Sequence, residues 1–277
     1  MRTASVLLSA VPLFICACVG AASGVPDGGR DAGELGGGSG GGPTGGGSTG
    51  GGSTGGGSTG GGSAGGGGSG GRTDAGYDTN FDGTQNPISE GGTWGQQGRT
   101  SGLDWTNVRT GGGIAYGTQT GNDGYDDSIA LLTGFGPNQR VTAVIHLAGT
   151  RSASTSTHEV ELILRGSYTP HQQRLYECNI GYAGPSGWYS QIVRQDGPIG
   201  TFTEITNSVS QTPDIRDGDV FTAEIIGEVI NTYVNGVKVG TATDANIATG
   251  QPGIGFFWRG TENIEDFGFT ALTATPL

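Results

Sequence analysis

The chain has 277 residues, 60 of which are glycine, and it carries a formal net charge of −12. Nucleic acids and anionic membrane surfaces attract clustered Lys and Arg, so this acidic balance argues against both as partners. Apolar side chains are dispersed over about 200 residues after position 75, which is enough for one core of ordinary size. We therefore expect a single folded domain in that part of the chain.

Residues 1–18 have the layout of an export signal, because the basic Arg2 precedes an apolar run that ends in small residues. At roughly 15 residues this run is too short to span a hydrocarbon core of ~30 Å comfortably, so we expect it to be cleaved. The segment from Ile15 to Cys18 resembles a bacterial lipoprotein signal, which implies that Cys18 becomes the lipidated N-terminus. The alternative is an ordinary signal peptide that is cleaved near Gly20 and leaves no lipid anchor.

Residues 19–75 have the composition of a tether. From Gly36 to Gly71 the chain consists almost only of Gly, Ser and Thr, and the five-residue repeats contain no apolar side chain to bury. A coil of about 36 such residues has an r.m.s. span of roughly 30–35 Å. No Lys follows these glycines, so they do not fit a phosphate-binding loop. We expect a flexible, disordered Gly/Ser-rich linker, followed by one domain at 76–277.

The domain at 76–277 shows the pattern of an all-β protein. Short runs rich in β-branched and aromatic residues alternate with Gly, Pro, Asn and Asp. Asn235-Gly236 lies between two such runs and is the strongest short hairpin signal, because both turn positions need a positive φ. The expected strands cover 141–149, 158–166, 173–183, 187–197, 219–227, 229–241, 252–258 and 265–273. Many short antiparallel strands in a domain of this size indicate a β-sandwich.

Four segments resemble the concanavalin A-like lectin/glucanase superfamily, which includes laminin-G-like modules. They are NFDGTQNPISEGGTW at 80–94, TYVNGVKVGTATD at 232–244, GQPGIGFFW at 250–258 and EDFGFTAL at 265–272. The resemblance implies a jelly-roll β-sandwich of two antiparallel sheets, in which 80–94 supplies the first strand, and commonly a carbohydrate site on the concave face. These motifs mark the fold and do not choose between a binding protein and an enzyme.

Alternation along 158–166 separates two faces of one strand. Val160, Leu162 and Leu164 share one side by period two, while Glu159 and Glu161 share the other. The apolar side is the one that must face the core. The two glutamates are therefore expected on the polar face of a sheet.

The strand at 173–183 has its own polar side, which carries Glu177 and Asn179. When the apolar sides of the two neighbouring strands are required to face the same core, Glu159 is predicted opposite Asn179. The same register places Glu161 opposite Glu177.

Extension of this logic to the neighbouring strands predicts a polar row across four of them. Its members are His146, Glu159, Asn179 and Gln191, with Glu161 and Tyr189 beside them. Such a row suits sugar hydroxyls, which need several fixed donors and acceptors and an aromatic platform. A one-residue slip in the strand at 187–195 would present Trp188, Ser190 and Arg194 in place of Tyr189 and Gln191. The alternative to a ligand site is a half-solvated sheet face that simply carries polar residues.

Glu159, Glu161 and Glu177 are weak candidates for catalysis. The family 16 glucanases of the superfamily carry Glu-x-Asp-x-Glu or Glu-x-Asp-x-x-Glu on one strand, with the outer carboxylates as nucleophile and general acid. Alignment of the first two acids on Glu159 and Glu161 puts Ile163 or Leu164 at the third position, so the required carboxylate is absent. The Cα atoms of Glu159 and Glu161 are expected about 6.6–6.8 Å apart, which permits a carboxyl pair. Glu161 with Glu177 across the strands is the second arrangement.

Other chemistries find little support in the sequence. Zinc spacing and a Gly-x-Ser-x-Gly elbow are both missing, and Cys178 falls in a core alternation that predicts an inert thiol. We expect no cofactor. Related sandwiches often carry a structural ion, so a calcium ion near Asp82, Asp266 or the acidic segment 121–127 is a secondary expectation.

Together these observations predict an exported monomer that is lipid-anchored in a bacterial cell envelope, at the outer membrane or the cell surface, or that is secreted if the signal is an ordinary one. The leading function is non-catalytic recognition of carbohydrate or of a cell-surface ligand, with the lipid as the only membrane contact. One alternative is a polysaccharide-acting glycoside hydrolase or lyase with an atypical carboxylate pair. The other is a purely structural role in surface display.

Overall fold

The computed structural model describes residues 71–73, 76–97, 105–120, 127–149, 157–198, 200–207 and 213–277. The chain divides into two units, Met1–Gly65 and Gly66–Leu277, and every described residue belongs to the second. The predicted signal at 1–18, with Cys18, and most of the predicted linker therefore lie outside the described residues. Within the described part of the chain, no helix is long and apolar enough to cross a membrane.

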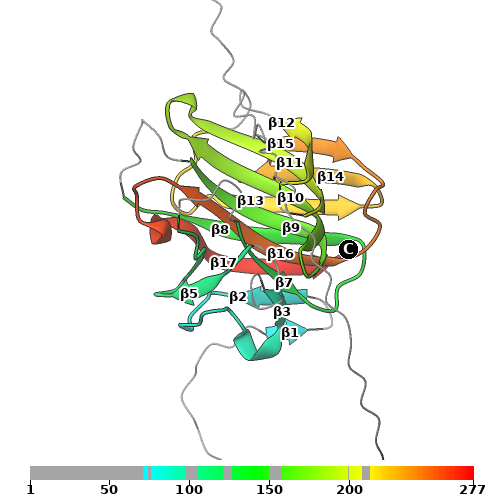
Figure 1. Ribbon diagram of the computed structural model, residues 1–277, viewed down its shortest axis with the longest axis horizontal. Coiled ribbons are helices and arrows are strands. Elements are labelled where there is room, and N and C mark those ends of the chain that lie inside the picture. The colour runs from blue at the N-terminus through cyan, green and yellow to red at the C-terminus, as the bar shows by residue number, and fades with distance from the viewer. Residues whose placement is uncertain are drawn as a thin grey trace, which may run out of the picture. The chain divides into compact units, whose positions relative to one another are not determined.

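Two sheets form the domain, and they overlap in the view of Figure 1. Sheet A runs in the order β1 (Gly71–Thr73), β2 (Gly76–Thr79), β17 (Phe267–Pro276), β8 (Gln139–Leu147), β13 (Val220–Ile226), β14 (Val229–Val234) and β15 (Val237–Thr243), with β6 (Ile114–Tyr116) on β17 and β5 (Arg109–Gly111) on β6. Sheet B runs in the order β12 (Phe202–Asn207), β11 (Trp188–Gly197), β10 (Gln172–Ala183), β9 (Thr157–Thr169), β16 (Gln251–Arg259), β7 (Ser128–Leu132) and β3 (Trp94–Gln97). β4 (Thr106–Asn107) adds a parallel pair with β7. The predicted all-β jelly-roll sandwich of two antiparallel sheets is confirmed.

The core lies between the sheets and follows the alternation read from the sequence. Val160, Leu162 and Leu164 of β9 are fully buried in the main apolar cluster, together with Phe221 and Ile225 of β13 in the opposite sheet. Burial of each such side chain is worth about 1.5–3 kcal/mol. Period-two patterning on both sheets thus fixes which face of each strand looks inward.

The Asn235-Gly236 hairpin is confirmed between β14 and β15. Both residues have positive φ, 50° for Asn235 and 77° for Gly236, as a two-residue turn between twisted strands requires. The turn joins Val234 to Val237 and so aligns β14 with β15.

Sheet A begins earlier than the sequence indicated. β1, at Gly71–Thr73, lies inside the range 19–75 that was predicted as linker, and it pairs antiparallel with β2. Its three residues carry no apolar alternation. Only main-chain pairing reveals this strand, which a pattern search cannot detect.

The resemblance implied that the segment 80–94 supplies the first strand, but the structure shows that it does not. Phe81 is fully buried, but it follows β2 with a φ of 55°, and the chain then loops into the 3₁₀ turn η1 (Glu90–Gly92). The buried Glu90 carboxylate holds this loop by accepting hydrogen bonds from the Tyr77 hydroxyl and, at 2.9 Å, from Trp94 Nε1. This buried acid and a short main-chain bridge between Gln85 and Thr110 therefore hold the segment together.

Candidate functional site

The face of sheet B that points away from the core carries most of the predicted site residues. We call it the polar face, and its members are Glu159 and Glu161 on β9, Glu177 and Asn179 on β10, and Tyr189 and Gln191 on β11. Trp188 and Ile192 of β11 pack in the main core, so the one-residue slip of that strand is excluded. Gln191 lies opposite Asn179, as predicted.

The predicted register between β9 and β10 is wrong by two residues. Glu161, not Glu159, lies opposite Asn179, and Glu159 lies opposite Gly181. The strands continue to Thr169 and from Gln172, so their turn is shorter and lies further along the chain than the sequence indicated. Pairing next to this turn is three residues away from the predicted register, and a bulge between Arg174 and Tyr176 takes one of those residues back. Because side chains alternate with period two, a two-residue slip leaves every glutamate on its predicted face.

His146 does not belong to the row. It lies on β8 of sheet A, opposite Gly268 of β17, and its Nδ1 is 3.4 Å from Asp217 Oδ1. β8 and β9 are consecutive in the chain but pair in different sheets, whereas the prediction assumed that neighbours in sequence pair with each other. The polar row therefore loses its fourth strand.

The three glutamates come together. One carboxylate oxygen from each of Glu159, Glu161 and Glu177 lies within 4.8 Å of the other two. Glu161 is 0% exposed and Glu177 is 4% exposed, while Glu159 is half-buried at the rim. Within the described residues this is the one group of three or more acidic, His or Cys side chains close enough to share an ion.

The partners of these acids are unequal. Glu177 accepts hydrogen bonds of 3.0 Å from Asn179 Nδ2 and of 3.0 Å from Gln195 Nε2, and Glu159 accepts one from the Tyr189 hydroxyl. Both carboxylate oxygens of Glu161 are buried without any hydrogen-bond partner. An unpaired buried polar group of this kind costs about 1–3 kcal/mol, and more if it is charged.

Two glycines make room for this arrangement. A Cβ atom on Gly255 of β16 would lie 2.0 Å from Glu161 Oε2, and one on Gly181 of β10 would lie 2.1 Å from Tyr189 Cζ. Gly181 therefore lets the Tyr189 ring lie across the sheet, where its hydroxyl reaches Glu159. Gly255 leaves the space into which the Glu161 carboxylate fits.

Burial and mutual repulsion disfavour the charged forms of all three acids. Burial and then the charge of Glu177 raise the pKa of Glu159 to about 8, although the hydrogen bond from Tyr189 opposes the shift. Burial, followed by the charges of Glu177, Asp127 and Glu159, raises the pKa of Glu161 well above its usual range. Burial also raises the pKa of Glu177, and its two amide hydrogen bonds only partly offset this.

Sequence reasoning missed Phe257, which lies opposite Glu159 on β16 and is half-buried. Cross-strand partners share a face, so the Glu159 carboxylate lies between Phe257 on one side and the Tyr189 ring on the other. The run GFFW at 255–258 contained the signal, because its second Phe falls on the polar face once the register with β9 is known.

An apolar cluster covers the remainder of the polar face. Ile163, which shares the side of Glu161, is fully buried there with Trp105, Ile129 and Leu131. Ile163 and Leu164 were the positions at which a family 16 glucanase needs its third acid, and both are enclosed in apolar surroundings. β9 therefore lacks the third acid that, in a family 16 glucanase, would work with Glu159 on the same glycosidic bond.

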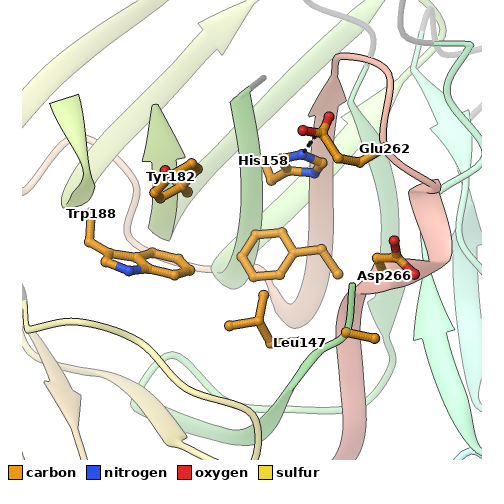
Figure 2. A pocket seen from close by; sticks show the side chains of 8 residues that line it. Leu147, His158, Tyr182, Trp188, Glu262 and Asp266 are labelled. Carbon is orange, nitrogen blue, oxygen red and sulfur yellow. Dashed lines mark ion pairs between the residues drawn. The ribbon is translucent and has the colours of Figure 1, made fainter. Parts of the chain in front are cut away.

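A separate recess opens at one end of the sandwich, between the sheets (Figure 2). His158, Tyr182 and Trp188 line it from sheet B, and Figure 2 shows Glu262 placed over His158, with a separation of 3.6 Å between His158 Nε2 and Glu262 Oε2. Tyr182 and Trp188 pack edge to face at 5.2 Å between ring centroids. The aromatic rings of the recess pack on one another and its histidine pairs with an acid, so these side chains close the end of the core.

Neither a protein-family model nor a curated protein matches this chain. Among solved structures, the carbohydrate-binding module CBM66 from Bacillus subtilis is 15% identical, with 58% of this chain and 81% of that chain covered and a TM-score of 0.39. The kappa-carrageenase from Pseudoalteromonas carrageenovora is 11% identical, with 71% and 92% covered and a TM-score of 0.43. A structure described with endo-acting O-glycanases of the human gut microbiota is 12% identical, with 73% and 98% covered and a TM-score of 0.45. At identities this low the likeness concerns the fold alone.

Proposed function

We propose that the domain binds carbohydrate without catalysis, through the rim of the polar face of sheet B. The observation that carries this proposal is the half-buried Glu159 carboxylate between Phe257 and Tyr189. Sugar rings present apolar faces and hydroxyl edges, and binding sites for such ligands combine aromatic walls with a few fixed polar groups. Glu159 supplies acceptors for hydroxyl groups, and Phe257 supplies a surface for a ring face.

Further polar groups extend the same rim. Gln191 is half-buried, and its Nε2 lies 3.1 Å from Glu204 Oε2 on the neighbouring β12. Asn179 Nδ2 lies 3.5 Å from Gln191 Oε1. Asn179 is itself buried and helps to hold Gln191, so a ligand that meets the Gln191 amide would not have to order it first.

The burial of the other acids favours binding over hydrolysis. A glycosidase needs two carboxyl groups that both reach the scissile bond. Glu161 and Glu177 are enclosed, so Glu159 is the member of the trio that a sugar could reach directly. A hydrolase or lyase with an atypical pair is the alternative, and release of product from a polysaccharide would identify it.

The experiment is retention of the chain on a panel of immobilised polysaccharides, followed by titration of the best ligand. We expect Phe257→Ala and Glu159→Gln each to weaken binding at least about tenfold, which corresponds to about 1.4 kcal/mol. Tyr233→Ala, on the outer face of sheet A, is the matched control and should bind as the parent does. Unchanged binding by both polar-face variants would refute the site, and a reducing-sugar assay on the same panel decides between binder and enzyme.

We further propose that the chain is an exported lipoprotein in which the Gly/Ser-rich segment displays the domain from a membrane anchor at Cys18. The support is the Ile15-to-Cys18 pattern and the length of the repeat that follows it. Labelling with a radioactive fatty acid should mark the parent chain and fail to mark Cys18→Ala. Equal labelling of both, or of neither, contradicts the anchor and leaves a secreted protein.

A further inference from the structure

We propose that Glu159, Glu161 and Glu177 together bind a Ca²⁺ ion beneath the rim of the polar face. The three carboxylates come from two neighbouring strands, β9 and β10, and each offers one oxygen within 4.8 Å of the other two. Oxygens bound to one Ca²⁺ lie 2.3–2.6 Å from it, so two of them are at most about 4.6–5.2 Å apart. The cluster therefore already has the dimensions of a calcium coordination shell.

Glu161 is the observation that separates this cluster from an ordinary acidic patch. Its side chain is 0% exposed, both of its oxygens lack a hydrogen-bond partner, and one of them faces the oxygens of Glu159 and Glu177. Natural proteins rarely bury a carboxyl group without a partner. A divalent cation satisfies both oxygens at once, and no group of the protein in the described residues does so.

A second oxygen, on the strand next to Glu161, is also buried without a hydrogen-bond partner among the described residues. Asn179 Oδ1, on the residue opposite Glu161, is buried without a hydrogen-bond partner, and Asn179 is 1% exposed. Calcium sites commonly combine carboxylates with neutral amide oxygens. All the donors are hard oxygens, and no thiol or imidazole belongs to the group, so a soft metal such as zinc is not the expected occupant.

The charges around the cluster also favour a bound cation. Glu159, Glu161 and Glu177 repel one another, and Asp127 adds a fourth negative charge that acts on Glu161. Within the described residues, the hydrogen-bond donors to these three acids are Tyr189, Asn179 and Gln195, all of them neutral. A bound Ca²⁺ would offset most of the charge that the trio carries when it is ionised.

The competing occupant of the cluster is the proton. Protonation would remove the repulsion, because a neutral carboxyl group carries no charge. Two measurements distinguish the occupants. A Ca²⁺ ion binds with a fixed stoichiometry and is removed by a chelator. Protonation depends on pH and is unaffected by a chelator.

The test uses the chain as exported, stripped with a chelator and titrated with CaCl₂ by calorimetry, without any sugar present. We expect one Ca²⁺ per chain and a Tm that rises with calcium concentration, since a ligand of the folded state stabilises it. Glu161→Gln should weaken binding at least about tenfold. Glu224→Gln, at a buried acid on sheet A, is the matched control and should bind calcium as the parent does.

Three results would overturn the proposal. The first is no calcium binding up to about 10 mM, which is roughly ten times the weakest dissociation constants of extracellular calcium modules. The second is Mg²⁺, Mn²⁺ or Zn²⁺ binding in place of Ca²⁺. The third is unchanged calcium binding by Glu161→Gln, which would move the site elsewhere, for example toward Asp82 or Asp266. Circular dichroism checks that the variant is folded, and Glu177→Gln replaces it if it is not.

The cation site and the sugar site fail independently. Phe257→Ala removes an aromatic wall without touching an acid, so it tests the sugar site alone, and calorimetry without sugar tests the cation site alone. Calcium binding without glycan binding would therefore retain this inference and refute the proposed function.

Discussion

Two buried glutamates, one on the outer face of each sheet, differ in their hydrogen-bond partners. Glu224 on β13 of sheet A is 7% exposed, and Glu161 on β9 of sheet B is 0% exposed. Glu224 lies opposite Arg140 and receives hydrogen bonds of 3.0 and 2.6 Å from its Nε and Nη2 atoms, and one of 2.8 Å from the Tyr233 hydroxyl. Glu161 lies opposite Asn179 and Gly255 and receives none.

The pKa values move in opposite directions as a result. Burial alone would raise the pKa of Glu224, but the hydrogen bonds from Arg140 and Tyr233 outweigh it and hold the pKa below its usual range. Burial and neighbouring acids raise that of Glu161. Glu224 therefore finds its partners within its own sheet, whereas Glu161 finds none among the described residues.

The largest expected effect comes from replacing each acid by methionine, which is apolar and similar in length. In chelated protein, Glu161→Met should raise the free energy of unfolding by about 1–2 kcal/mol, because it removes a buried group without partners. Glu224→Met should lower it by about 1–2 kcal/mol, because Arg140 and Tyr233 lose their acceptor. Urea denaturation measures both, and a shift of the same sign in the two variants would contradict the comparison.

The pH dependence of stability should differ between the two faces. In chelated protein, unfolded Glu159 loses its proton near its ordinary pKa of 4.5, whereas the folded protein keeps it up to about 8. The folded state then binds more protons, so stability is full below about pH 4.5 and falls as the pH rises to about 8, by roughly 2 kcal/mol after solvent screening. Glu224 acts oppositely, because its lowered pKa makes its contribution disappear only as the pH falls below the unfolded value.

Tm measurements between pH 4 and 9, with chelator and with saturating CaCl₂, check this prediction. Calcium should remove most of the decline, because it binds the ionised acids. A decline that persists unchanged with calcium would show that protons, and not the ion, are the usual partner of the trio.

The glycine under Glu161 provides a smaller effect. Gly255→Ala should cost about 1.5 kcal/mol in chelated protein and weaken calcium binding, since its Cβ would lie 2.0 Å from Glu161 Oε2 and displace an enclosed carboxylate. Asn231→Ala is the control, because Asn231 lies opposite Glu224 in the same relation and should leave calcium binding unchanged. Urea denaturation measures the loss of stability and calorimetry measures calcium binding, so an unchanged result in either one would contradict the prediction.

The smallest effect concerns Tyr233 and Tyr189, whose hydroxyl groups donate to Glu224 and Glu159. Tyr233→Phe should lower the free energy of unfolding by about 1 kcal/mol, because Glu224 loses the hydrogen bond from the Tyr233 hydroxyl and no ion replaces it. Tyr189→Phe should cost less than about 0.5 kcal/mol in calcium-loaded protein, because the ion remains as a partner of Glu159. A larger loss of unfolding free energy for Tyr189→Phe than for Tyr233→Phe would contradict the view that Glu224, and not Glu159, depends only on partners within the protein.

The parts that could be predicted from the sequence are those that local periodicity determines. The face of Glu159 and Glu161, the core side of Cys178 and the Asn235-Gly236 turn all follow from period two or from turn chemistry, and all are confirmed. Burial raises the pKa of the Cys178 thiol, which agrees with the inert cysteine that was expected.

The parts that could not be predicted depend on long-range pairing. His146 was placed by chain order, but β8 and β9 pair in different sheets. The two-residue slip between Glu159 and Asn179 results from the position of the turn, which a bulge corrects by one residue, and neither feature leaves a mark on the apolar pattern. Phe257 enters the site because β16, nearly a hundred residues further along the chain, pairs with β9. Burial of Glu161 also needs packing from other segments, so its isolation was invisible from its own strand.

The short strand β1 has a mechanical consequence. It lies at the edge of sheet A, and its outermost pair joins Gly71 to Asp78 of β2. A pull on the N-terminal side would reach that pair first and peel the strand away one residue at a time, as a zipper opens, rather than load all its hydrogen bonds together in shear. The three-residue strand would thus detach before the longer strands of the sheet do.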